Sequence, residues 1–379
     1  MARLGIVAES TRLVDLVQER IDQFLAQRAP IVAGISPDLE HFIDFSRDFL
    51  SGGKRFRALF SYWGWAAVHS PDAAFDPMPG APARDDLAAI VGVSSALEVF
   101  HAAALVHDDI MDNSDTRRGS PAAHKRFESD HDAGGWIGSS SAFGQSAALL
   151  LGDLLLGWSD ELFDEGVALQ DDLAAGRAAR AEFVHMRTEV TLGQYLDILE
   201  EASWLRHDES ELLSRAHRVI VYKSAKYSIE APLAIGASLG GGNADQIAAL
   251  RAFGLPLGIA YQLRDDLLGV FGDPSVTGKP SGDDLREGKR TVLIALARKS
   301  MPGNVRRVLD DLLGDPALDA DQVAMLQEAI RSSGAIEQVE TIISRNVGLA
   351  KEAISDAPLA RGARQQLLEL ADTVSRRVA

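Results

Sequence analysis

The amino-acid sequence predicts an all-α protein, and three observations lead to this prediction. Apolar residues recur at helical spacing along almost the whole chain. No run of alternating β-branched residues is bounded by turns, so strands should be minor at most. Glycine-, proline- and serine-rich stretches separate the periodic segments at 77–82, 134–144, 240–243 and 273–280. We therefore expect a single large helical-bundle domain over residues 1–379, with the helices packed around a central substrate cavity.

The predicted helices follow one another closely along the chain. Residues 1–40 should form an N-terminal helical extension, because an apolar stripe with the spacing of one helix face runs through Leu13, Val14, Val17, Ile21 and Phe24. The same periodicity predicts further helices over residues 54–69, 86–112, 146–165, 170–201, 209–239, 244–270, 288–299, 304–313, 320–333, 335–354 and 359–377. Neither the extension nor the loop at 134–144 carries a recognisable chemical motif.

Composition and charge exclude several classes of function. Hydrophobic residues make up 46% of the 379 residues and charged residues 25%, which is ordinary for a globular protein with a sizeable core. The 55 acidic residues outnumber the 38 basic ones, and a net charge of −17 argues against nucleic-acid binding. The absence of cysteine excludes disulfides, thiolate zinc sites and cysteine nucleophiles. With no signal-peptide layout and no long uncharged apolar run, we expect a cytoplasmic protein without stable membrane insertion.

Two clusters of aspartates carry the strongest functional signal. Asp108, Asp109 and Asp112 end one apolar, helix-forming run, and Asp265 and Asp266 lie inside a second one. On a helix, Asp108 and Asp112 lie one turn apart on the same face, and such a like-charge pair costs about 0.2–0.5 kcal/mol. A bound cation would offset this repulsion. Closely spaced carboxylates without cysteine or paired histidine suit a hard ion such as Mg²⁺.

Basic residues form clusters of their own, close to the aspartates in the sequence. The stretch 52–57 reads Gly-Gly-Lys-Arg-Phe-Arg, and bases at the start of a helix favour anion binding. The other basic residues that flank the two aspartate clusters in the sequence are Arg117, Arg118, Lys223, Lys279 and Lys289. His101 lies two helix turns before Asp108, and Gln262 lies one turn before Asp266. Separate acid and base clusters suit diphosphates, whose oxygens bind both metal ions and Lys or Arg.

Taken in order, these motifs resemble those of the trans-isoprenyl diphosphate synthases, or polyprenyl synthetases. The resemblance covers about residues 52–291 and rests on Gly52 to Arg57, His101, Leu105 to Asp112, Arg117-Arg118-Gly119, Lys223-Ser224, Gln262 with Asp265-Asp266, and Gly278-Lys279 with Gly288-Lys289. The motifs look most like those of actinobacterial geranylgeranyl diphosphate synthases. The resemblance implies the isoprenoid synthase fold, a homodimer, and condensation of isopentenyl diphosphate with an allylic diphosphate.

The resemblance also implies a role for each matching residue. Two Mg²⁺ ions on the allylic diphosphate would be held by Asp108 and Asp112, and a third with the help of Asp265. The same diphosphate would contact Arg117, Lys223 and Lys279, with Lys289 nearby. Isopentenyl diphosphate would be bound by Lys54, Arg57, His101 and Arg118. The developing allylic cation would face Ser224 and Gln262. The implied reaction is ionisation, condensation and elimination, with no side-chain nucleophile or dedicated base.

One position departs from the family pattern. The second aspartate motif of the family usually has a third aspartate four residues after the first, where this chain has Gly269. The second site would then depend on Asp265 with Asp266, and water could complete the shell of the third ion. Two other acid pairs, Asp171-Asp172 and Asp283-Asp284, are expected to be solvated.

Product length should depend on the residues that precede Asp108. Ala104 and Ala103 lie one turn, about 5.4 Å, deeper along the helix. The resemblance implies that aromatic residues there stop synthesis at fifteen carbons, whereas two methyl groups leave the pocket open. Phe100, a further turn down, is the expected floor. We therefore predict a twenty-carbon product, geranylgeranyl diphosphate; a longer polyprenyl or a farnesyl product is the alternative.

Three other functions compete with this interpretation. A terpene cyclase also carries an aspartate-rich Mg²⁺ motif, but it binds no second diphosphate and would not need Lys54, Arg57 and His101. An inactive regulatory subunit would typically lack acidic motif residues, and here only the last acid of the second motif is absent. A generic acidic helical metal-binding protein would leave the ordered lysines and arginines unexplained.

Overall fold

The computed structural model describes residues 2–69, 85–273 and 281–375. Within these ranges the chain is helical apart from loops and one two-stranded antiparallel hairpin, which confirms the all-α prediction. The elements in chain order are α1 (Ala2–Ile35), η1 (Pro37–Leu39), α2 (Glu40–Phe49), α3 (Phe56–Val68), α4 (Asp85–Met111), β1 (Thr116–Arg117), β2 (Ser120–Pro121), α5 (Ala123–Ala133), α6 (Ser140–Val167), α7 (Leu173–Ser203), η3 (Trp204–Arg206), α8 (Glu209–Val219), η4 (Ile220–Glu230), α9 (Ala231–Leu239), α10 (Ala244–Phe271), α12 (Asp283–Glu287), α13 (Val292–Ser300), α14 (Gly303–Leu312), α15 (Ala320–Ser332), α16 (Ala335–Ala353) and α17 (Arg361–Ser375).

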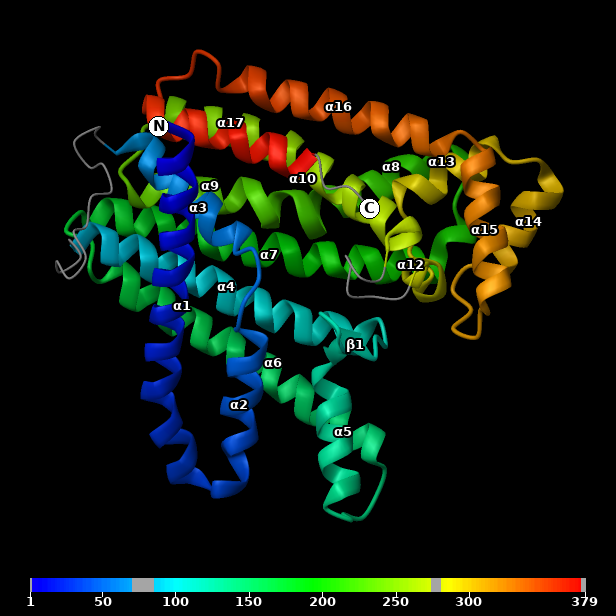
Figure 1. Ribbon diagram of the computed structural model, residues 1–379, viewed down its shortest axis with the longest axis horizontal. Helices are drawn as coiled ribbons and strands as arrows, with labels where there is room; N and C mark the ends of the chain where they lie inside the picture. Colours follow the sequence, from blue (N-terminus) through cyan, green and yellow to red (C-terminus); the bar gives the residue numbers. More distant parts are fainter. Residues whose placement is uncertain (1, 70–84, 274–280, 376–379) are drawn as a thin grey trace.

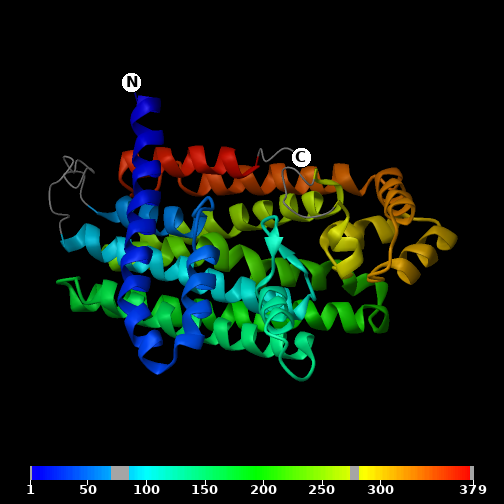
Figure 2. The ribbon, with the colours of Figure 1, turned by 60° about the horizontal axis from the view of Figure 1, so that its bottom comes forward.

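The long helices lie in layers. In Figure 1, α4, α6, α7, α9 and α10 run in roughly one direction across the molecule, and α1 crosses them steeply. Both ribbon views place α16 and α17 as an outer layer next to α10, on the side away from α6 (Figure 2). The helices α14 and α15 close one end of the molecule (Figure 1).

Two clusters of buried apolar side chains form the core. The larger joins α1 to α7 with α9, α17 and the first part of α10. The second joins α8, the later part of α10 and α13 to α16. Among the described helices, α4 is the one long and apolar enough to span a membrane by length and composition, but 83% of that stretch is buried inside the fold. It serves here as a core helix, and its burial explains its apolar sequence.

The segment from α8 to α9 differs most from the prediction. We expected one regular helix over 209–239, but its middle, η4, is a π-helix with wider turns. It packs between α7 and α10, and glycines on both neighbours make room for its backbone. A Cβ atom on Gly193 of α7 would collide with the backbone of Lys223, and one on Gly258 of α10 would lie 2.6 Å from Cα of Ala225. The backbone of η4 at Lys223 and Ala225 therefore packs directly against the main chains of α7 and α10.

Three short helices were not predicted, and one long helix begins earlier than expected. The helices α2, α5 and α12 lie where the apolar periodicity is short or interrupted by charges. The helix α6 begins at Ser140, inside the stretch 134–144 that we expected to be a loop. The side chain of Ser139 accepts a hydrogen bond from the amide of Ala142 and so caps the helix start. The turn predicted at 240–243 is confirmed between α9 and α10.

Candidate active site

One large cavity lies between α3, α4, α7, η4, α10 and α12 and encloses about 840 Å³. It brings together nearly all the site residues predicted from the sequence. Those that line it are Lys54, Arg57, His101, Ala104, Asp108, Asp112, Arg117, Arg118, Lys223, Ser224, Gln262, Asp265 and Lys289. Lys279 lies outside the described residues. The cavity therefore joins segments as far apart in the sequence as those of Lys54 and Lys289.

Two of the three predicted chain-length residues, Ala103 and the expected floor Phe100, do not line the cavity. Ala103 is fully buried in the larger core cluster, and Phe100 packs edge-on against the rings of Phe183 and Tyr227. Successive helix positions are about 100° apart, so Ala103 faces the core while Ala104 faces the cavity. Of the three predicted chain-length positions, only Ala104 is at the wall.

The start of α3 presents its bases to the cavity because of an unusual backbone. Gly53 and Arg55 both have positive φ angles, 91° and 48°, and Arg55 occupies the position just before the helix. This turn directs the Arg55 side chain into the core, where it is 5% exposed and donates to the Leu50 carbonyl and, at 3.4 Å, to Glu98. Arg55 thereby anchors the turn, and Lys54 and Arg57 on either side of it line the cavity.

Arg57 and His101 belong to one cluster around Tyr227. The guanidinium of Arg57 lies 4.2 Å from the centre of the Tyr227 ring and donates to Ser228 at 3.0 Å. A ring nitrogen of His101 lies 3.1 Å from the Tyr227 hydroxyl. Burial, and then the charges of Arg57 and Arg118, hold the pKa of His101 well below its ordinary value. The cluster thus combines fixed positive charge with a neutral imidazole.

The first aspartate pair is held by bases from distant helices. Asp108 accepts from Gln194 at 2.9 Å and from Lys223 at 3.2 Å, and Asp112 pairs with Lys289 at 2.6 Å. Burial would raise the pKa of Asp108, but Lys223 and the other bases outweigh it and lower the pKa. Burial and the neighbouring Asp108 raise the pKa of Asp112 to about 7. The second oxygen of Asp112 is buried and has no hydrogen-bond partner among the residues that the structure describes.

The side chain of Asp109, which lies between Asp108 and Asp112 in the sequence, points toward Arg117. Its side chain is fully buried and accepts hydrogen bonds from Arg117, whose Nε lies 2.9 Å from Oδ1. Arg117 also lies 3.7 Å from Asp108, so it bridges the two acids. The hairpin β1–β2 is thereby fixed to the end of α4.

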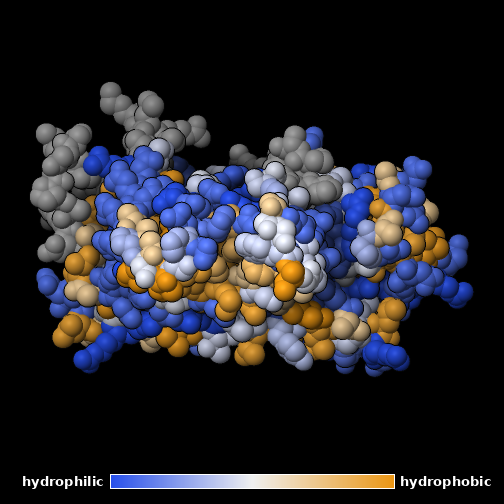
Figure 3. Space-filling model, turned by 90° about the horizontal axis from the view of Figure 1, so that it is seen from below, coloured by the Kyte–Doolittle hydropathy of each residue, from blue (hydrophilic) through white to orange (hydrophobic). Residues whose placement is uncertain are grey.

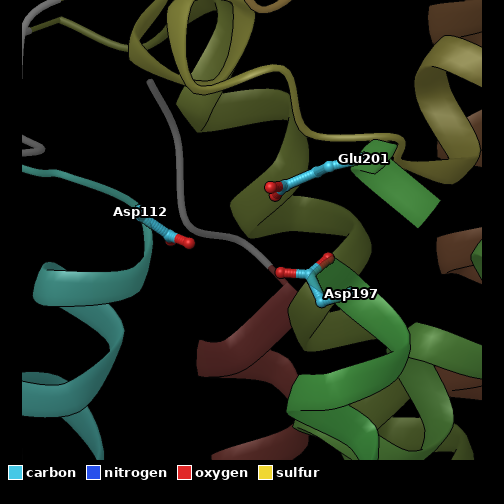
Figure 4. Close-up of side chains that lie close together, drawn as sticks. All are labelled: Asp112, Asp197 and Glu201. Carbon is cyan, nitrogen blue, oxygen red and sulfur yellow. The ribbon is translucent and has the colours of Figure 1, made fainter. Parts of the chain in front are cut away.

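Two acids of α7, Asp197 and Glu201, complete the cluster, and neither was predicted from the sequence. Their carboxylates and that of Asp112 point toward a common space, as Figure 4 shows, and one oxygen of each lies within 4.8 Å of the others. The ammonium of Lys289 pairs with all three, and Lys223 donates to Asp197 at 2.5 Å. Burial opposes the charge of Lys289, but Asp197 and its neighbours raise its pKa well above the ordinary value. Acids and bases thus neutralise each other inside the cavity.

The second aspartate pair lies on α10. Gln262 donates to one oxygen of Asp266 at 2.8 Å, and the other oxygen is buried with no partner in the described part of the chain. Burial, together with the charge of Asp265, raises the pKa of Asp266 to about 7. Our expectation that Asp283 and Asp284 are solvated is wrong, because both line the cavity and are half-buried. The expectation holds for Asp171 and Asp172, which are exposed.

A sequence signal for the missed acids exists on α7. Gln194, Asp197 and Glu201 follow one another at i, i+3 and i+7, which places them on one helix face. Charged residues surround them along α7, so the pattern does not stand out as Asp108 does in its apolar run. For Tyr227 and Asp284 we find no such signal.

The arrangement suits two anionic groups held side by side. Carboxylates of α4, α7 and α10 provide oxygen ligands for hard divalent cations, and buried lysines and arginines can bind phosphate oxygens directly. Lys54, Arg57, Arg118 and the neutral His101 form a second side of the cavity, where bases outnumber the one carboxylate, Glu98, that lines the cavity beside them. Apolar residues complete the lining: Ala104, Leu105, Val190, Ala216, Val219 and Ile220.

The chain is similar to proteins of a known family. Residues 40–330 match the family model described as polyprenyl synthetase. A short chain isoprenyl diphosphate synthase of Methanothermobacter thermautotrophicus is 32% identical over 76% of this chain and 79% of its own length. A geranylgeranyl diphosphate synthase of Mycobacterium tuberculosis is 29% identical over 81% of this chain and 76% of its own.

A solved structure resembles the whole chain. The geranylgeranyl pyrophosphate synthase of Corynebacterium glutamicum, complexed with isoprenyl diphosphate and magnesium, has a TM-score of 0.88 and 36% identity. The match covers 97% of this chain and 99% of that one.

Proposed function

Because the chain belongs to the polyprenyl synthetase family and is a trans-prenyltransferase, we propose that it extends an allylic diphosphate with isopentenyl diphosphate to the twenty-carbon geranylgeranyl diphosphate. The observation that carries this proposal is the cavity itself. One part of its lining carries carboxylates and lysines, suited to a metal-bound diphosphate, and another part carries an excess of bases, with Glu98 paired to Arg55. A cavity with two anion sites fits a condensation of two diphosphates better than cyclisation of one.

Each side of the cavity receives one substrate. The allylic diphosphate would lie against Asp108, Asp112 and Asp265, within reach of Arg117, Lys223 and Lys289. Isopentenyl diphosphate would lie against Lys54, Arg57, His101 and Arg118. Lys279 would reach the first of these diphosphates. Residues Ser224 and Gln262 would present oxygen dipoles to the reacting carbons.

The donor set fits Mg²⁺, for which three ions are expected. The proposed ligands are all carboxylate oxygens, and one oxygen each of Asp112 and Asp266 is buried with no hydrogen bond to a described residue. When bound, Mg²⁺ would neutralise the charge that develops on the departing diphosphate. Asp108 and Asp112 would hold two ions, and Asp265 would help hold the third.

The chain's own residues then stabilise both ends of the bond that breaks. As the allylic carbon–oxygen bond opens, its electron pair leaves with the diphosphate, where Arg117, Lys223 and Lys289 stabilise the added charge. The terminal carbon of the isopentenyl double bond forms a bond to the allylic carbon, which leaves a cation on the other carbon of that double bond. The carbon next to this cation then loses a proton to the released diphosphate, and the electron pair of its C–H bond forms the new double bond. No side-chain nucleophile takes part.

The twenty-carbon product is the finer part of this proposal. Its support is the small side chain of Ala104 at the cavity wall and the names of relatives such as the Mycobacterium tuberculosis enzyme. Other relatives are named geranylfarnesyl and farnesyl diphosphate synthase, so the product must be measured. The single-domain organisation over residues 1–379 stays a prediction. So does the cytoplasmic location of the protein.

The test is an assay of the purified protein with Mg²⁺, radiolabelled isopentenyl diphosphate and each allylic primer in turn. We expect label in a twenty-carbon product, and loss of labelling in Asp108→Ala but not in Asp171→Ala, a matched change at an exposed acid. Consumption of primer without incorporation of label would instead indicate a cyclase. An Asp108→Ala protein that elongates at the native rate would refute the proposed site.

We also propose that the protein is a homodimer that pairs through α6 and α7. Large apolar side chains remain exposed on these helices: Leu149, Leu150, Val184, Leu192, Tyr195 and Ile198. Figure 3, which shows the molecule from below, has patches of apolar residues along the lower half of the picture. Exposed apolar residues grouped on neighbouring helices are typical of a protein interface.

A further inference from the structure

The short helix α12 places a carboxylate against a glycine of α10. A Cβ atom built on Gly269 would coincide with the carboxylate of Asp284, so this side chain fills the space that a side chain at position 269 would take. Gly269 and Asp284 both line the cavity. The contact is possible only because residue 269 has no side chain.

This position relates Asp284 to Asp265. Gly269 follows Asp265 by four residues on α10, so the two positions lie one turn apart on the same helix face. The Asp284 carboxylate therefore lies about one turn from Asp265 along the cavity lining. On α4, Asp108 and Asp112 have the same spacing. Each side of the cavity thus presents two carboxylates about one helix turn apart.

The fold holds Asp284 in this position. Gly282 and Gly288, with φ angles of 73° and 78°, bound the five residues of α12. Leu285 is fully buried in the second core cluster and anchors the helix. The amide of Lys289 donates to the Asp284 carbonyl at 3.0 Å. One short turn therefore carries both Asp284 and Lys289 to the cavity.

A second observation at this end of the cavity is a buried carboxylate oxygen that is not hydrogen-bonded to any described residue. Asp266, next to Asp265, is 4% exposed, and its Oδ2 atom is buried with no hydrogen-bond partner among the described residues. Buried carboxylate oxygens are almost always partnered, so an unpaired one calls for a proton or a cation. Asp265 and Asp284 line the same part of the cavity as Asp266.

We propose that Asp284 is a metal ligand that, together with Asp265, forms a divalent-cation site, in the place of the side chain that Gly269 lacks. The inference rests on the proposed function, because the remaining ligands would be water and diphosphate oxygens. The site takes Mg²⁺ or Mn²⁺, since its protein ligands are all carboxylates. Asp284 thus belongs to the substrate-binding machinery, although it lies outside the aspartate motifs.

The first test counts metal ions without relying on turnover. Electron paramagnetic resonance measures Mn²⁺ bound to the protein in the presence of inorganic pyrophosphate. We expect Asp284→Ala and the isosteric Asp284→Asn to bind one Mn²⁺ fewer per chain than the wild type. The half-saturating Mg²⁺ concentration in the assay should rise by about tenfold or more. Asp283→Ala, with the same charge change on the same helix, should keep the full count.

The second test moves the carboxylate from α12 to α10. Gly269→Asp combined with Asp284→Ala has room for the new side chain and should regain the lost Mn²⁺. Gly269→Ala combined with Asp284→Ala fills the same space without a carboxylate and should not regain it. Gly269→Asp alone should lower the melting temperature, because its side chain collides with Asp284. If the Gly269→Asp double variant regains the Mn²⁺ and the Gly269→Ala double variant does not, positions 269 and 284 are coupled.

The outcomes separate the inference from the function on which it rests. Wild-type protein that binds no Mn²⁺ with pyrophosphate would overturn the metal-dependent function and the inference together. A full Mn²⁺ count in a folded Asp284→Ala variant, with the wild type active, would overturn the inference alone. The same holds if Asp283→Ala causes the loss, or if the Gly269→Asp double variant fails to regain the ion. Circular dichroism confirms that each variant is folded.

Discussion

Lys289 is paired with more carboxylates than any other lysine described in the structure, and its contacts explain how the cavity tolerates its acids. Its ammonium lies 2.6 Å from Asp112, 2.9 Å from Glu201 and 3.2 Å from Asp197. Removing one partner from such a buried group leaves the others uncompensated. The pair occupies one oxygen of Asp112, and the other is buried with no hydrogen-bond partner among the described residues. The ion pair therefore leaves one carboxylate oxygen of Asp112 without a described protein partner.

His101 should make the stability of the protein sensitive to mild acid. Its pKa lies well below 6.5 in the folded state because of burial and of Arg57 and Arg118. Below pH 6.5 the unfolded chain therefore binds a proton that the folded protein does not. The contribution of His101 to stability is complete above pH 6.5 and is lost as the pH falls below it.

The measurement compares wild type and His101→Gln by urea unfolding at pH 7.5 and pH 5.5. The fall in the free energy of unfolding between these pH values should be smaller in the variant by about 1 kcal/mol. His41→Gln, at an exposed histidine, serves as the matched control. An equal pH dependence in wild type and His101→Gln would contradict the prediction.

Ala104 and Ala103 should respond differently to the same substitution. Ala104 lines the cavity, so Ala104→Phe should shorten the product toward fifteen carbons while the protein stays folded. Ala103 is fully buried in the core, so Ala103→Phe should cost about 1–3 kcal/mol of stability through overpacking. Chromatography of the dephosphorylated products and urea unfolding measure the two effects. An unchanged product length in Ala104→Phe would remove Ala104 as the determinant.

At the scale of elements, the sequence predicts long helices better than short ones. The helices α4 and α10 show apolar periodicity over many turns, so both their existence and their approximate ends were predictable. The helix α12 has five residues, too few for a period, and its two flanking glycines look like loop signals. The π-helix η4 was not predictable, since its geometry depends on how closely α7 and α10 approach it.

The site followed the same rule. Asp108, Asp265 and the basic motifs were predicted because they interrupt apolar helices or lie in ordered clusters. Asp197 was not, because its helix is charged on several sides. Asp284 reaches the cavity only through the path of the chain between α10 and α12, which no local pattern encodes. Contacts between distant segments were therefore the part that the sequence left open.

The close packing of α7 on η4 gives a prediction for an element. A methyl group on Gly193 would collide with the backbone that carries Lys223. Gly193→Ala should therefore lower stability by about 1–3 kcal/mol and reduce activity, because Lys223 shifts away from Asp108 and Asp197. Gly348→Ala on α16, where nothing lies within 4 Å, should be neutral or stabilising. If both variants unfold at the same urea concentration, the close contact does not constrain η4.

At the scale of the whole molecule, the cavity lies where the two core clusters meet. The helix α10 contributes its first part to one cluster and its later part, including the residues around Asp265, to the other. The aspartates of α4 follow residues of the first cluster, and Lys289 follows the short helix α12, which packs into the second cluster through Leu285. A relative movement of the two core clusters would therefore change the distance between the aspartates of α4 and Lys289. The geometry of the site thus depends on how the two clusters pack against each other.

The exposed apolar residues of α6 and α7 predict that two chains associate through these helices. The wild type should have twice the 40.7 kDa mass of one chain in size-exclusion chromatography with light scattering. Leu192 is 60% exposed on α7, and Leu192→Arg should shift the mass toward one chain, because a buried unpaired charge opposes association. Leu349, 47% exposed on α16, provides the control Leu349→Arg, which should remain a dimer. A wild type with the mass of one chain would exclude the dimer, and a dimeric Leu192→Arg would place the interface elsewhere.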